Sequence, residues 1–196
     1  MNKIMFNDKY GLTQAVLDGQ KTMTRRLAEK ILVEDENCEL RWNGKFKPAR
    51  FKVGEVVAIA QSYEEVFDEY AEIAYIANKP TPDNFKAFGS QSDITLPRSL
   101  PGWTNKMFVR ADLMPHHIRI TDVRLERLRD INSEDCLKEG IEARIVGCHT
   151  FYFAPGIDWP FHFPKPAFAA LIDKVSGKGT FDSNPWVYVY TFDLVK

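Results

Sequence analysis

The feature that most limits the possible folds is Arg119–Leu128, a long stretch in which charged and apolar residues alternate. Alternation with a period of two is typical of a β-strand that buries one face. Trp186–Val195 is rich in aromatic and β-branched residues and predicts a second long strand. Val56–Ala60 is apolar at every position, which predicts a strand buried on both faces. The chain therefore has to build its core mainly from sheet.

The predicted helices are few and short. Apolar residues recur at helical spacing through Leu12–Gly19, where the glycine marks the end of the helix. Asn132–Gly140 begins with a residue pattern like a capping box, because Asp135 follows Asn132 by three positions. A third helix is expected to open at Pro166. Strands with two or three short helices predict a mixed α+β domain.

The composition is that of an ordinary folded protein. Of the 196 residues 44% are hydrophobic, 13% are aromatic and 27% are charged, which excludes an intrinsically disordered chain. The net charge of −1 excludes a broad basic surface for nucleic acid but leaves room for a local basic cleft. Residues 62–96 carry seven acidic and two basic side chains. We therefore predict a single domain over residues 1–196 with an acidic insertion at about 62–106.

Cysteine usage and apolar runs predict a cytoplasmic protein without a membrane segment. Cys38, Cys136 and Cys148 are widely spaced and odd in number, so they indicate no disulfide framework. The longest apolar stretches fall far short of the ~20 residues that a membrane span requires. None of the usual zinc spacings fits four potential ligands near one another: Cys148, His149, Asp158 and His162. We expect no metal and no cofactor.

The densest group of candidate functional side chains lies in the segment Gly19–Arg26. It brings three cations and two hydroxyl groups within six residues: Lys21, Thr22, Thr24, Arg25 and Arg26. Arginine forms paired hydrogen bonds and lysine presents a point charge, so this set suits a phosphate or a polar heterocycle. The segment has too few glycines for a P-loop. A basic strand edge exposed to solvent is the alternative interpretation.

This segment, Gly-x-Lys-Thr-x-Thr-Arg-Arg behind a short helix, resembles the signature of ASCH domains, which belong to the PUA-like superfamily. Further segments are similar to that family in the same order along the chain: Val53–Gln61, Leu113–Pro115 with Arg119-Ile120, Val123–Ile131, Glu139–Ile141 and Asn184–Val187. The resemblance spans nearly the whole chain and is loosest over residues 62–106.

The resemblance implies a PUA-like small β-barrel with short flanking helices and one helical or loop insertion. Many relatives are assigned RNA or nucleotide binding. The expected partner is therefore RNA or a nucleoside- or nucleotide-like ligand, held in a basic cleft without catalysis. The choice among RNA, DNA and a free nucleoside stays open, as do any protein partner and the oligomeric state. The expected ligand-binding residues are Lys21, Thr22, Thr24, Arg25, Arg26, Gln61, Arg110, Arg119 and Trp186.

Two alternatives remain at this point. Some small relatives are amidohydrolases that remove the acetyl group of N4-acetylcytidine with a lysine, a threonine and a glutamate. By position these are Lys21 and Thr24, while the family glutamate falls on Gln61. Glutamine cannot act as a general acid or base near neutral pH, so binding is favoured over catalysis. The second alternative is a protein-interaction module that uses the acidic helix predicted at 62–78.

Overall fold

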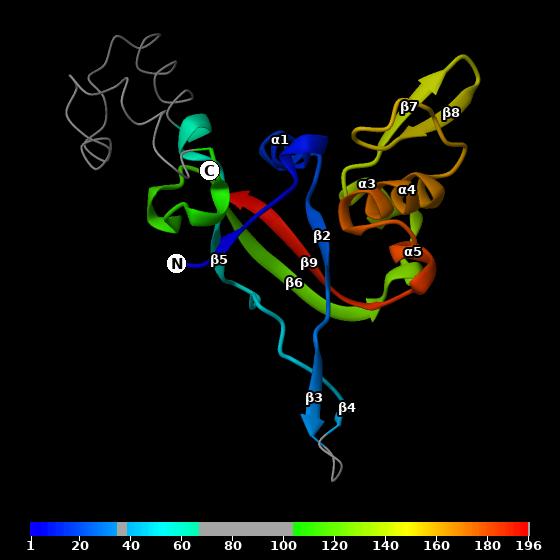
Figure 1. The fold of residues 1–196 in the computed structure, drawn as a ribbon. Coiled ribbons are helices and arrows are strands. Elements are labelled where there is room, and N and C mark those ends of the chain that lie inside the picture. The colour runs from blue at the N-terminus through cyan, green and yellow to red at the C-terminus, as the bar shows by residue number, and fades with distance from the viewer. Residues whose placement is uncertain (35–38, 67–103, 196) are drawn as a thin grey trace, which may run out of the picture. The chain divides into compact units, whose positions relative to one another are not determined.

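The computed structural model describes residues 1–34, 39–66 and 104–195 (Figure 1). The chain falls into two compact units, and each is described by itself. Unit 1 comprises Met1–Phe6, Val56–Ile118 and Val195–Lys196, and unit 2 comprises Asn7–Glu55 and Arg119–Leu194. Sheet predominates and helices are few, which confirms the predicted α+β class. None of the described helices has the length and apolar character needed to cross a membrane.

Unit 1 is built on a short parallel pair of strands. β1 (Lys3–Ile4) pairs with β5 (Val56–Ile59), whose last three residues are fully buried, as the apolar run predicts. The ammonium group of Lys3 donates to the carbonyl oxygens of Met107 and Val109 at 2.5 and 2.8 Å. These bonds tie η5 (Lys106–Phe108) to β1, and η6 (Ala111–Leu113) follows it.

The predicted acidic insertion lies mostly outside the described residues. Of the helix predicted at 62–78, residues 63–66 are helical and belong to unit 1. Val66 packs with Ala58, Ala60, Val109 and Met114 in a small apolar core. Burial of Val66 thus fixes the described beginning of this segment to the core of unit 1.

Unit 2 is built on a sheet with the strand order β6-β9-β2. β6 (His117–Arg127), whose first two residues belong to unit 1, and β9 (Trp186–Val195) are the two predicted long strands. β2 (Met23–Leu27) carries most of the basic motif and pairs antiparallel with β9, from Met23 opposite Thr191 to Leu27 opposite Val187. Burial of Val187 and Val189 on β9 secures this edge of the sheet.

Local signals explain where the helices of unit 2 begin and end. α1 (Leu12–Leu17) follows η1 (Asp8–Tyr10) and stops before Gly19, which has a φ of 73°. α3 (Ser133–Lys138) follows η7 (Leu128–Asp130) and has the predicted cap, because the Asn132 carboxamide accepts the Asp135 N–H at 2.8 Å.

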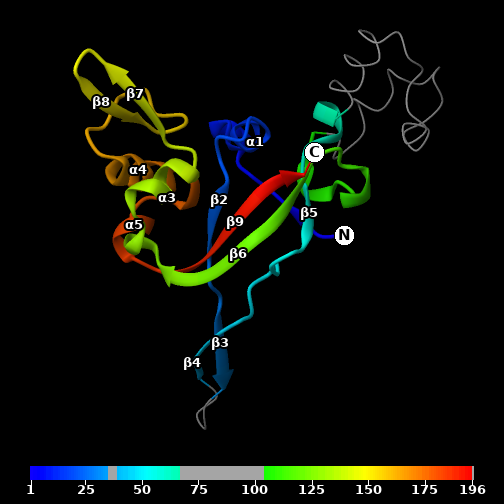
Figure 2. The ribbon, with the colours of Figure 1, turned by 180° about the vertical axis from the view of Figure 1, so that it is seen from behind.

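α4 (Pro164–Ser176) begins two residues earlier than predicted. Both Pro164 and Pro166 fit the first helical turn, where the backbone N–H has no helical partner to lose. The extended Phe163 precedes it. Seen from both sides, α3, α4 and α5 (Thr180–Ser183) lie together (Figures 1 and 2).

Two antiparallel hairpins complete unit 2. One consists of β3 (Lys30–Glu34) and β4 (Leu40–Phe46), and the other of β7 (Glu142–Val146) and β8 (His149–Phe153). The first extends from the end of β2 away from α3 and α4 (Figure 1). Within the described residues, neither unit closes its strands into a barrel.

Candidate functional site

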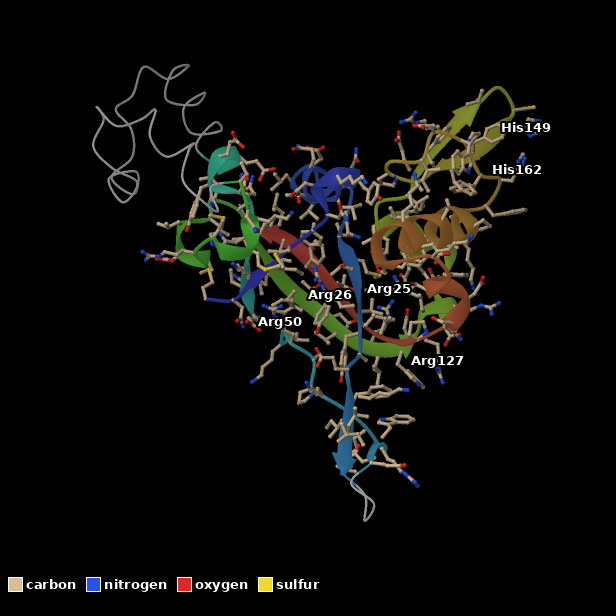
Figure 3. All side chains as sticks on the ribbon, in the orientation of Figure 1. Arg25, Arg26, Arg50, Arg127, His149 and His162 are labelled. Atoms are coloured by element: carbon tan, nitrogen blue, oxygen red, sulfur yellow. The ribbon has the colours of Figure 1, made fainter. Side chains whose placement is uncertain are left out.

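The basic motif lies at the start of β2 and is fixed there by backbone hydrogen bonds. Lys21 N–H donates to Ala15 O at 2.8 Å and Thr22 N–H donates to Lys138 O at 2.9 Å. Because side chains alternate along a strand, Arg25 projects to one face and Thr24 and Arg26 to the other. Figure 3 shows Arg25 on the side of β2 that faces α3 and α4, and Arg26 on the opposite side. The side chains of the motif therefore lie in two separate environments, one on each face of β2.

On the first face, Arg25 is held by three carboxylates. Its Nε and Nη2 donate to Glu126 Oε1 at 3.0 and 2.7 Å, and Nη2 also reaches Asp135 Oδ2 at 2.9 Å. Nη1 donates to Glu139 Oε1 at 3.1 Å. The guanidinium group is buried and lies 5.8 Å from the ring centroid of Phe168. All three guanidinium nitrogens thus donate hydrogen bonds to carboxylates within the protein.

Lys21 shares one of these carboxylates. Its Nζ donates to Glu139 Oε2 at 2.5 Å and to the Glu139 carbonyl oxygen at 2.8 Å, and both side chains are about 95% buried. Burial lowers the pKa of Lys21, although the charge of Glu139 acts in the opposite direction. The amine is therefore easier to deprotonate than an ordinary lysine.

Arg124, on β6, closes the group. It donates to Asp135 Oδ2 at 2.5 Å and to Glu126 Oε2 at 3.1 Å, and its side chain is 38% exposed. We call these three cations and three carboxylates the ion cluster: Lys21, Arg25, Arg124, Glu126, Asp135 and Glu139. The cluster is balanced in formal charge, which is how buried charges are tolerated.

On the opposite face, Arg26 lies near another arginine. Burial and the charge of Arg50 both lower the pKa of Arg26, and Arg50 is the charged group with the largest effect on it. Arg50 is anchored through its backbone N–H, which donates to the Tyr190 hydroxyl at 3.0 Å, and its guanidinium lies 5.3 Å from the Phe51 ring centroid. Figure 3 labels both residues on the side of β2 opposite to Arg25. We call this pair the Arg26–Arg50 site.

The remaining predicted site residues are placed elsewhere. Gln61 and Arg110 belong to unit 1, whereas the motif belongs to unit 2. Gln61 is buried and its Oε1 accepts no hydrogen bond from the residues that the structure describes. Arg110 is exposed and paired with Asp112 at 2.6 Å. Arg119 is exposed on β6. The carboxylate in contact with Lys21 is Glu139.

Trp186, at the start of β9, lies in a row of aromatic and cationic groups. The Arg127 guanidinium sits 4.5 Å from its ring centroid and Phe46 lies 5.9 Å away. Within unit 2, the predicted arginines and lysine of the motif divide between the ion cluster and the Arg26–Arg50 site, and Trp186 belongs to this row.

Comparisons with protein-family models, curated proteins and solved structures give no match to the chain. The site must be interpreted from its own chemistry.

The candidate zinc ligands are not gathered into a metal centre. The ring centroids of His149 and His162, labelled in Figure 3, lie 6.3 and 5.3 Å from that of Phe151, in an edge-on and a tilted contact. In the part of the chain that the structure describes, His, Cys, Asp and Glu side chains nowhere group in threes as a metal site.

Sequence reasoning missed the carboxylates of the ion cluster. A signal for two of them was present, since Asp135 and Glu139 are four residues apart and so lie on one face of a helix. Glu126 and Arg124 are two residues apart on one strand and so share a face. What the sequence could not supply was the pairing between these faces and β2.

Proposed function

We propose that the chain is an ASCH-like domain of the PUA-like superfamily that binds RNA or a nucleotide-like ligand, without catalysis, and that the Arg26–Arg50 site receives the phosphate. The observation that carries this proposal is the pairing of like charges at that site. Two guanidinium groups held near each other repel, and the cost rises when one is partly desolvated. An anion between two positive groups is attracted by both, so this arrangement favours the binding of a phosphate.

The surroundings of the site suit a nucleotide. Arginine offers a planar set of donors that matches two oxygens of a phosphate. Tyr190 and Phe51 are buried beside it with ring centroids 5.4 Å apart, which holds the backbone of Arg50 in place. Arg25 has a different role in this proposal, because its donors are occupied by the ion cluster.

Calorimetric titration with cytidine 5′-monophosphate tests the phosphate site. Arg26→Gln and Arg50→Gln should each weaken binding by about 10- to 100-fold, the value of a charge-assisted hydrogen bond. Arg41→Gln is the matched control, because Arg41 is an exposed arginine that pairs with Glu39 in the same unit. Equal affinity in wild type and both site variants would refute the phosphate site.

A second candidate function, amide hydrolysis, is favoured by the contact between Lys21 and Glu139. The sequence resemblance implies a Lys–Thr–Glu set and aligns its glutamate with Gln61, whereas Glu139 is the acid that Lys21 contacts. A lysine whose pKa is lowered by burial can act as a general base. In this scheme Thr24, buried on β2, is the nucleophile that the resemblance implies. Because Thr24 projects to the face of β2 opposite Arg25, the amine of Lys21 has to leave Glu139 to reach its hydroxyl group.

The chemistry of this second candidate balances without a metal or cofactor. The neutral amine of Lys21 accepts the hydroxyl proton of Thr24, whose oxygen attacks the acetyl carbon of an N4-acetylated cytidine. The C–N bond breaks and the proton passes to the departing amino group, which gives cytidine and an acetylated threonine. Water then hydrolyses the ester, and acetate leaves.

Chromatography of N4-acetylcytidine incubated with the protein separates the two candidates. Hydrolysis predicts cytidine and acetate in equal amounts, lost in Thr24→Ala and in Lys21→Met. Thr150→Ala, which removes an exposed threonine of β8, is the control and should keep the activity. Glu139→Gln should shift the pH profile of the rate, because it removes the charge that raises the pKa of Lys21. No product above the uncatalysed background would leave binding as the function.

A further inference from the structure

Three aromatic rings follow one another over the β3–β4 hairpin and the start of β9. Trp42 and Phe46 on β4 have ring centroids 5.3 Å apart, and Phe46 lies 5.9 Å from Trp186 on β9. We call these three residues the aromatic strip. It continues along the hairpin, because Leu32 is the cross-strand partner of Trp42 and both are exposed. The strip and Leu32 together form an apolar patch on the surface of unit 2.

A positively charged side chain contacts the ring at each end of the aromatic strip. Lys30 Nζ lies 5.0 Å from the ring centroid of Trp42, and the Arg127 guanidinium lies 4.5 Å from that of Trp186. Both distances are those of cation–π contacts. The charged groups that contact the outer rings are therefore positive at both ends of the strip.

Trp42 is exposed and Phe46 and Trp186 are half-buried, and the two tryptophans are held in place. Trp42 is 44% exposed and its indole N–H donates to Lys45 O at 2.8 Å. Trp186 follows a turn in which Asn184 adopts φ 46°, with its carboxamide oxygen accepting the Arg129 N–H at 2.8 Å. Arg127 donates to the Asn184 carbonyl oxygen at 3.0 Å. Rigid exposed rings lose little conformational entropy when a ligand covers them.

We infer that the aromatic strip is a binding surface for single-stranded nucleic acid. Bases stack on exposed aromatic rings regardless of sequence, while neighbouring cations attract the phosphates, and the strip offers both. The flanking Lys30 and Arg127 argue against an apolar protein partner, which would leave these charges unpaired. The inference deepens the proposed function and rests on it for the class of ligand, because a strand bound here extends beyond a single nucleotide.

Fluorescence anisotropy with labelled single-stranded oligonucleotides of about ten residues, oligo(rU) and oligo(dT), tests the strip. Trp42→Leu keeps an apolar side chain but removes the ring, so affinity should fall by about 5- to 150-fold, the value of one stacked base. Trp42→Phe keeps a ring and should retain most of the affinity. Comparison of the two oligonucleotides shows whether the 2′-hydroxyl group contributes.

Trp159→Leu is the matched control. Trp159 is also an exposed tryptophan of unit 2 with a lysine, Lys174, 5.9 Å from its ring centroid, and it lies outside the strip. Its loss should leave oligonucleotide affinity unchanged. Thermal unfolding followed by circular dichroism confirms that each variant is folded, and Arg127→Gln gives a second variant that keeps all three rings.

The outcomes separate this inference from the phosphate site. Strip variants should lose oligonucleotide affinity but keep affinity for cytidine 5′-monophosphate, whereas Arg26→Gln should lose the mononucleotide. Absence of oligonucleotide binding, or equal loss in Trp42→Leu, Trp42→Phe and Trp159→Leu, would overturn the strip. Self-association of the wild type that Trp42→Leu abolishes, without oligonucleotide binding, would assign the surface to a second copy of the chain and also overturn it.

Discussion

Arg25 is the residue on which the buried charges of unit 2 depend. Three carboxylates, from β6, from α3 and from the residue that caps α3, converge on its guanidinium group. Lys21 also contacts one of them, and Arg124 contacts the other two. Replacing one partner of a buried pair costs much more than the pair contributes, because the other charge stays buried without compensation. A basic residue singled out for ligand binding thus has a role in folding.

Replacing Arg25 with methionine should therefore destabilise the protein strongly. We expect the free energy of unfolding to fall by about 3–5 kcal/mol, as for other broken buried ion pairs. Arg41→Met removes an exposed pair with Glu39 and should change it by no more than about 1 kcal/mol. Urea unfolding of both variants measures the difference, and equal small effects would show that the ion cluster contributes little to stability.

Lys21 makes the stability depend on pH. Burial lowers its pKa in the folded state, whereas the unfolded chain keeps the ordinary value of 10.5. Between these two values the unfolded chain binds a proton that the folded chain does not. The free energy of unfolding therefore rises with pH across this window, and the gain is lost as the pH falls through the lowered pKa.

Comparison with Lys21→Met isolates this dependence. Urea unfolding at several pH values below 10.5 should show the wild type gaining stability relative to the variant as the pH rises, by at most about 1.4 kcal/mol per pH unit. A difference that is flat over that range would mean that Lys21 keeps its proton beside Glu139. That result would also remove the base required for amide hydrolysis.

At the scale of elements, α3 shows which features of the site local sequence could predict and which it could not. Its cap was predictable because Asn132 and Asp135 are three residues apart and act within one turn. Its contact with β2 was not predictable in the same way, since Lys21 and Glu139 are 118 residues apart in sequence. Alternation predicted β6, and richness in aromatic and β-branched residues predicted β9.

The hairpins show why other elements escaped prediction. β4 is exposed at nearly every position, so no burial pattern marks it as a strand, and Asn43-Gly44 indicates a turn. Gly44 instead lies within β4 with a φ of 81°. β7 is exposed along its whole length, so its sequence likewise has no burial pattern that predicts a strand. Elements that bury little leave little trace in the hydrophobic pattern.

Replacing Asn132 with alanine should test how far α3 supports the ion cluster. Loss of the cap should lower the free energy of unfolding by about 1 kcal/mol. Because α3 carries Asp135 and Glu139, the effect should be smaller in the Arg25→Met background, where these carboxylates have lost their shared partner. A double-mutant cycle by urea unfolding measures this coupling, and strictly additive effects would show that the cap and the cluster act independently.

At the scale of the whole molecule, the net charge of −1 hides an uneven distribution. Residues 62–96 hold seven acidic and two basic side chains, so the rest of the chain carries a small positive excess. Within unit 2, much of the basic motif is neutralised by the ion cluster. The cations that we propose to contact a nucleic acid are Lys30 and Arg127 beside the aromatic strip, and Arg26 and Arg50 at the proposed phosphate site.

This charge distribution predicts a shallow salt dependence of binding. For single strands the logarithm of affinity falls with the logarithm of salt by about 0.7 per phosphate contacted, so four cations give a slope of about −3 at most. Anisotropy titrations of oligo(rU) between low and physiological salt measure it. Arg127→Gln should make the slope shallower by about 0.7, while Arg41→Gln, which removes an exposed paired charge, should leave it unchanged. A slope twice as steep would mean that further cations beyond these four hold the strand, and would contradict the proposed set of contacts.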